Sequence, residues 1–131
     1  MRKVLFILPA VLYAAPVIAQ APDWSTAKVV EVDLSSFAIT PNTITLERGT
    51  PYRLHLVNKA SGGHDFVARE FFAQATLDPA SRSTVQKGEV DLGGGETADL
   101  RLVATQPGTY RVHCSHFMHA ALGMKGRIIV R

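Results

Sequence analysis

Apolar and polar side chains alternate through most of the chain after residue 28. The alternation is clearest where Tyr52, Leu54 and Leu56 are separated by single polar side chains. A period of two is typical of a half-buried strand, because successive side chains of a strand point to opposite faces. Similar alternation, or a short β-branched run, occurs in segments 29–34, 39–46, 66–68, 90–92, 98–103, 110–114 and 128–130.

Turn residues separate these segments and indicate how the strands are connected. Gly49-Thr50-Pro51, Gly93-Gly94-Gly95 and Pro107-Gly108 are typical turn sequences. Residues 70–75 are the only stretch with helical spacing of apolar side chains, and we expect the polar segment 79–88 to be irregular. Seven or eight short strands with one short helix predict an all-β fold, an antiparallel β-sandwich with Greek-key connections.

The first 19 residues have a different character from the rest of the chain. A basic start, Met1-Arg2-Lys3, precedes an apolar run over residues 4–15, and Val17-Ile18-Ala19 places small side chains where a signal peptidase reads them. The run is too short to span a bilayer. We therefore predict a secretory signal peptide at 1–19, an N-terminal arm at 20–27 and one domain at 28–131, located in the periplasm.

Removal of residues 1–19 changes the charge of the protein. The Lys and Arg count falls from 14 to 12 against 11 acidic residues, and the formal net charge falls from +3 to +1. No basic surface remains to favour nucleic acid as a partner. The remaining 112 residues are enough for one hydrophobic core and exclude a multidomain protein.

Cys114 is the single cysteine of the chain. Cysteines of exported proteins are usually paired in disulfides, and a lone cysteine has no partner within its own chain. Three roles remain for Cys114 at this point: an inert buried thiol, a link to another chain, or a metal ligand.

The spacing of residues after Cys114 favours the metal ligand. His119 follows Cys114 after four residues, and Met124 follows His119 after four more. A thiolate, an imidazole and a thioether are soft or borderline ligands that suit copper. His64, at the end of another predicted loop, supplies a second imidazole. We predict a trigonal site of His64, Cys114 and His119 with Met124 as a long axial ligand, as in blue-copper electron-transfer sites.

The segment Cys114-x4-His119-x4-Met124-Lys-Gly126, with a closing strand after it, resembles the cupredoxins. These small blue-copper proteins include plastocyanin, pseudoazurin, amicyanin and azurin, and the resemblance covers most of residues 28–131. It implies an eight-stranded sandwich, one type 1 copper ion per chain and one-electron transfer rather than enzymatic catalysis. The family often has Asn after the upstream histidine. Here that position is Asp65, and we expect its carboxylate to accept a hydrogen bond from Ser115.

The ligand loop contains competing candidates. His116 and Met118 could replace His119 and Met124, but only the latter pair keeps two equal four-residue steps from Cys114. His113, directly before Cys114, is similar to the histidine that binds a neighbouring copper in copper nitrite reductases and multicopper oxidases. Those enzymes use more cupredoxin domains and more histidines than this chain offers, so no second catalytic copper is expected.

The loop around the predicted ligand His119 is apolar. We expect redox partner proteins to dock on it, or the segment 70–75 to cover it. Its apolar residues are Phe117, Met118, Ala120, Ala121 and Leu122. The sequence thus predicts a monomeric periplasmic carrier of single electrons. The alternatives are a copper protein for delivery, sequestration or resistance, and an enzyme built on an oligomer with His113 at an interface.

Overall fold

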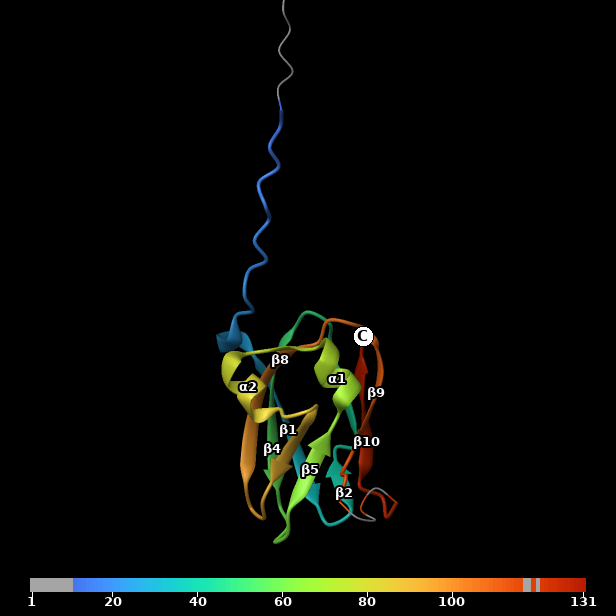
Figure 1. Cartoon of the computed structure of the whole chain (residues 1–131). Helices are drawn as coiled ribbons and strands as arrows, with labels where there is room; N and C mark the ends of the chain where they lie inside the picture. Colours follow the sequence, from blue (N-terminus) through green and yellow to red (C-terminus); the bar gives the residue numbers. More distant parts are fainter. Residues whose placement is uncertain (1–10, 117–118, 120) are drawn as a thin grey trace, which may run out of the picture.

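Two β-sheets of five strands each pack face to face, and their facing side chains form one hydrophobic core (Figure 1). The computed structural model describes residues 11–116, 119 and 121–131. The side chains that alternate in the sequence fill the core, since Leu54, Leu56 and Leu100 are fully buried. The predicted all-β sandwich is confirmed. The described residues form ten strands where seven or eight were expected, because segment 39–46 forms two strands and a two-residue strand at 76–77 was not predicted.

The first sheet has the order β2 (Ala38–Thr40), β1 (Lys28–Ser35), β4 (Pro51–Asn58), β8 (Thr97–Val103) and β6 (Thr76–Leu77). The second has the order β3 (Thr43–Leu46), β10 (Lys125–Val130), β9 (Gly108–His113), β5 (His64–Val67) and β7 (Glu89–Leu92).

Two strand pairs depart from the expected antiparallel arrangement. β1 pairs with β4, and β3 pairs with β10, in parallel, while the other pairs are antiparallel. The predicted segment 39–46 is in fact two strands, β2 and β3, which lie in different sheets. Pro41 lacks an N–H for the strand ladder, and the chain crosses between the sheets there. This crossing brings β3 beside the last strand.

Two short α-helices and one 3₁₀ helix, η1 (Trp24–Thr26), accompany the sheets. The predicted helix is present as α1 (Arg69–Gln74), which buries two phenylalanine side chains. The expectation that 79–88 is irregular is wrong, because α2 spans Pro79–Thr84. Asp78 caps this helix by accepting a hydrogen bond from the Ser81 N–H at 2.9 Å, and proline occupies its first turn. Asp-Pro is a helix-start signal that a search for an apolar face overlooks.

Residues 11–20 contribute nothing to the core of the sandwich. Residues 11–20 are exposed and form no helix or strand, and this segment extends away from the two sheets (Figure 1). Its apolar side chains include Leu12 and Val17, which are 95% and 96% exposed. Within the described residues, no helix is both long and apolar enough to cross a membrane.

Asn58, at the end of β4, organises the loop that leads to β5. Its side chain is 1% exposed. Its Nδ2 atom lies 2.8, 3.1 and 3.0 Å from the carbonyl oxygens of Gly62, Leu92 and Gly93, and its Oδ1 atom accepts a hydrogen bond from the Ala60 N–H at 3.0 Å. One buried amide therefore fastens the 59–63 loop to the turn after β7.

Gly94 strengthens this junction by allowing close backbone contact. A Cβ atom at this position would lie 2.0 Å from the carbonyl oxygen of Ser61, so no larger residue fits without displacing the loop. The loop ends at His64, the first residue of β5. The position of His64 therefore depends on the contacts of Asn58 and Gly94. The sequence analysis assigned no role to either residue.

We predict that Asn58→Ala lowers the free energy of unfolding of the metal-free protein by about 2 kcal/mol, because buried carbonyl groups lose their donor. Urea denaturation measures the change. Asn42→Ala is the matched control, since Asn42 is exposed and its side chain accepts only a 3.4 Å hydrogen bond from Thr43. Equal stability of the Asn58 and Asn42 variants would show that the Asn58 amide does not hold the loop.

Candidate metal centre

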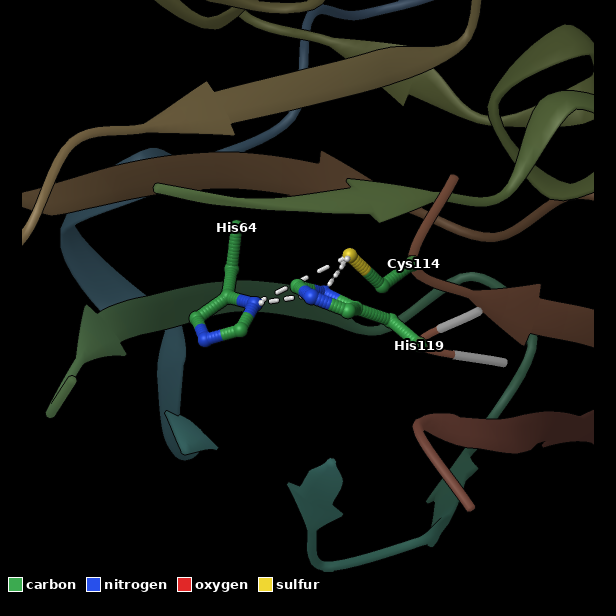
Figure 2. A group of neighbouring side chains, drawn as sticks. All are labelled: His64, Cys114 and His119. Carbon is green, nitrogen blue, oxygen red and sulfur yellow. Dashed lines mark hydrogen bonds between the residues drawn. The ribbon is translucent and has the colours of Figure 1, made fainter. Parts of the chain in front are cut away.

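His64, Cys114 and His119 converge at one end of the sandwich (Figure 2). His64 begins β5, Cys114 directly follows β9, and His119 lies in the loop between β9 and β10. The two Nδ1 atoms of the histidines are 3.2 Å apart. The Cys114 Sγ atom lies 3.4 Å from Nδ1 of His119 and 3.9 Å from Nδ1 of His64.

These three distances fit a single metal ion. A point equidistant from the two nitrogens and the sulfur lies about 2 Å from each of them. Metal bonds to imidazole nitrogen and thiolate sulfur in proteins are about 2.0–2.3 Å long. Two imidazoles and one thiolate in a trigonal set are the donors of a type 1 copper site.

Met124, the predicted axial ligand, lies beside two of these residues. Its N–H donates to the His119 carbonyl oxygen at 2.9 Å, and its own carbonyl oxygen accepts from the Cys114 N–H at 3.0 Å. Its side chain is fully buried and belongs to the hydrophobic core. The two backbone hydrogen bonds close the base of the ligand loop and keep Met124 next to Cys114.

Burial controls the protonation of the two innermost donors. It lowers the pKa of His64, and the neighbouring rings of His119 and His116 lower it further, so the imidazole is kept neutral as a metal ligand must be. Burial also raises the pKa of the Cys114 thiol. Because thiolate is the form that binds metal, loading of this site releases a proton from Cys114.

Asp65 connects the two segments that carry His64 and Cys114. The Ser115 N–H donates to Asp65 Oδ1 at 2.6 Å, and the Ser115 hydroxyl donates to Oδ2. Burial opposes ionisation of Asp65, but the two hydrogen bonds from Ser115, with contributions from Cys114 and His116, outweigh it and hold the pKa of this carboxyl below its usual value. The expected hydrogen bond between Asp65 and Ser115 is therefore confirmed.

His116 lies outside the trigonal set. It is exposed, and its ring stacks on that of His119 with centroids 5.5 Å apart and an interplanar angle of 27°. Instead, one of its ring nitrogens and a carboxylate oxygen from each of Asp65 and Asp91 lie within 4.8 Å of one another. The structure therefore places His116 and His119 in different donor groups, and the assignment of His119 as the copper ligand stays a prediction.

His113 belongs to neither of the two donor groups found among the described residues. It is half-buried and lines a small cavity with Val67, Arg69, Glu70 and Arg111. Its Nδ1 atom is buried and has no hydrogen-bond partner among residues 11–116, 119 and 121–131. Burial lowers the pKa of His113, and the charges of Arg111 and Arg69 contribute. His113 thus faces away from the converging donors.

Phe37 is a contact of the site that the sequence analysis missed. It lies in the turn between β1 and β2, and its ring meets that of His119 edge to face, with centroids 5.3 Å apart at 88°. Phe37 has a φ of 63°, a left-handed conformation unusual for a large side chain. No sequence pattern connects this turn to His119, because the contact depends on how the two sheets pack.

The predicted docking loop is described only in part. Ala121 and Leu122 are exposed. Three of its predicted residues, Phe117, Met118 and Ala120, lie outside the described residues, and so does the alternative of Met118 as a ligand.

Solved structures with the same fold include several copper proteins. Auracyanin from the photosynthetic bacterium Roseiflexus castenholzii is 20% identical with a TM-score of 0.59, over 81% of this chain and 98% of that one. Auracyanin A, a "blue" copper protein from Chloroflexus aurantiacus, is 17% identical with a TM-score of 0.54, over 79% and 99%. A multicopper oxidase from Campylobacter jejuni is 16% identical with a TM-score of 0.61, over 83% of this chain but 31% of the oxidase.

At these identities the likenesses show a shared fold. No curated protein matches the sequence. The profile of the family described as the cupredoxin-like domain matches residues 8–130, which is nearly the whole chain. Together with the sandwich and the convergence of His64, Cys114 and His119, this match shows that the chain belongs to the cupredoxin-like family.

Proposed function

We propose that this protein binds one type 1 copper ion through His64, Cys114, His119 and Met124 and carries single electrons between redox partners. The observation that supports the proposal most directly is the triangle of donor atoms, with sides of 3.2, 3.4 and 3.9 Å. Copper in such a site takes up or releases one electron.

The fold holds the proposed copper ligands rigidly, which favours electron transfer. Copper(I) prefers soft ligands and low coordination, and copper(II) prefers tetragonal nitrogen and oxygen sites, so a fixed cage of mixed donors is a compromise between the two. The hydrogen bonds of Asn58 and Asp65 hold the segments that carry the ligands. Ligands that move little when copper changes its oxidation state keep the cost of electron transfer low.

His119 is the proposed route for electrons to the surface. It is half-buried, whereas His64 and Cys114 are 5% and 1% exposed. Phe37 and Leu122, 43% and 54% exposed, are the large apolar side chains of the described residues near it. We propose that redox partners dock on this apolar surface, because transient redox interfaces are small and one such patch is enough. We also propose that the protein is a monomer.

We also propose that residues 1–19 are a signal peptide, with an arm at 20–27 and the cupredoxin domain at 28–131, and that the protein works in the periplasm. The exposure of residues 11–20 supports a segment that the fold does not need. The mature protein is expected to begin at Gln20. The intact mass and N-terminal sequence of protein from the periplasmic fraction measure this, and retention of residues 1–19 would contradict the proposal.

Cys114→Ser is expected to abolish the intense visible absorption of the copper(II) form, because the thiolate–copper bond gives rise to it. The sandwich is expected to persist, since its strands bury their apolar faces without the metal. Visible and EPR spectra after copper(II) addition measure the site, and circular dichroism measures the fold. A wild-type protein that binds copper(II) without colour would favour copper delivery or sequestration over electron transfer.

Met124→Leu tests the proposed axial ligand, with the same spectra and a measurement of the reduction potential. It is expected to keep the copper and the colour and to raise the reduction potential, because an axial thioether is a weak ligand that tunes the potential. An unchanged potential together with an unchanged spectrum would remove Met124 from the ligand set.

His119→Gly and His116→Ala are expected to behave differently. The first variant removes a ligand and opens the metal to water, and added imidazole is expected to restore the blue spectrum. The second removes a ring that stacks on His119 without joining the trigonal set, so the blue spectrum is expected to persist. Bleaching in His116→Ala with colour retained in His119→Gly would reverse the assignment.

A further inference from the structure

A second group of metal-binding side chains lies next to the proposed copper site. The carboxylate oxygens of Asp65 and Asp91 and a ring nitrogen of His116 lie within 4.8 Å of one another. Asp65 is on β5, Asp91 is on β7, and His116 comes from the ligand loop. None of the three belongs to the ligand set proposed for type 1 copper.

The pairing of β5 with β7 makes this group electrostatically unusual. Asp65 and Asp91 are directly opposite each other in the antiparallel register. Like charges at such positions destabilise a sheet. Among the described residues, no Lys or Arg lies within salt-bridge distance of either carboxylate. The register therefore places two carboxylates together, and the fold adds the imidazole of His116 to them.

Asp65 remains able to bind a cation in spite of its hydrogen bonds. Ser115 donates one hydrogen bond to each of its oxygens. An ionised carboxylate has about four acceptor positions, so these two bonds do not occupy all of them. Asp65 is 1% exposed and fixed in position, while Asp91 and His116 are exposed and can rotate toward a shared ion.

We propose that Asp65, Asp91 and His116 form a second metal site that binds a divalent ion of the zinc or copper(II) class. Two carboxylates and one imidazole are oxygen and nitrogen donors, which suit these ions, whereas the thiolate site is softer. The ion is held on the solvent side of the copper site, because Asp91 and His116 are exposed and the His116 ring stacks on His119. Its positive charge next to the copper ligands favours copper(I) and raises the reduction potential of the type 1 copper.

Zinc titration of the copper-loaded protein tests this site. Calorimetry with Zn²⁺ at neutral pH is expected to show saturable binding of one ion per chain. The visible band, recorded in parallel, is expected to persist, and the reduction potential of the blue copper is expected to shift upward. Absence of saturable binding would overturn the proposal. Binding that bleaches the visible band would overturn it too, because zinc would then be replacing copper.

Two variants and a matched control identify the ligands. Asp91→Asn and His116→Ala are each expected to weaken zinc binding at least tenfold, since each removes one ligand from a small set. Asp99→Asn is the control. Asp99 is exposed on β8 of the other sheet and also lies beside a histidine, 2.9 Å from Nδ1 of His55, but it has no opposing carboxylate in that pair.

The control variant is expected to bind zinc as the wild type does. Equal weakening in all three variants, or in none of them, would show that zinc binding does not depend on this group.

Discussion

The hydrogen bonds from Ser115 to the Asp65 carboxylate are the constraint on which the metal centre depends. Each of these residues directly follows a proposed ligand, so the bonds fix the distance between His64 and Cys114. The carboxylate is buried and charged, and two donors are needed to keep it so. Loss of either partner would leave a buried charge or an unpaired donor at the point where the two ligand segments meet.

The sandwich also holds the two loops that carry the proposed ligands. Asn58 fastens the loop before His64, and the backbone hydrogen bonds between Cys114, His119 and Met124 close the other loop at its base. The first loop joins β4 of the first sheet to β5 of the second, and the other loop joins β9 to β10 within the second sheet. The side chains of these strands belong to the hydrophobic core. Ligand geometry is thus set by buried polar contacts at the sheet ends, and the apolar core supplies the framework that holds those contacts.

The sequence predicted the sandwich and the converging donors because both leave short-range signals. Alternating apolar positions identify half-buried strands, and the equal steps from Cys114 to His119 and Met124 indicate a metal loop. The parallel strand pairs, α2 and the roles of Asn58 and Phe37 were not predicted. Strand partners and contacts between sheets depend on the path of the whole chain, and α2 presents only Ser81 to the interior, so it has no apolar period.

Phe37 lies in a hairpin of low local stability beside the proposed copper site. The turn that carries it leads into β2, an edge strand of only three residues that pairs with β1 alone. Short edge elements open at a free energy well below that of global unfolding. Opening of this hairpin withdraws the aromatic ring from His119 while the central strands stay paired. The local stability of this hairpin, and not only the stability of the whole sandwich, therefore determines how firmly the Phe37 ring is held against His119.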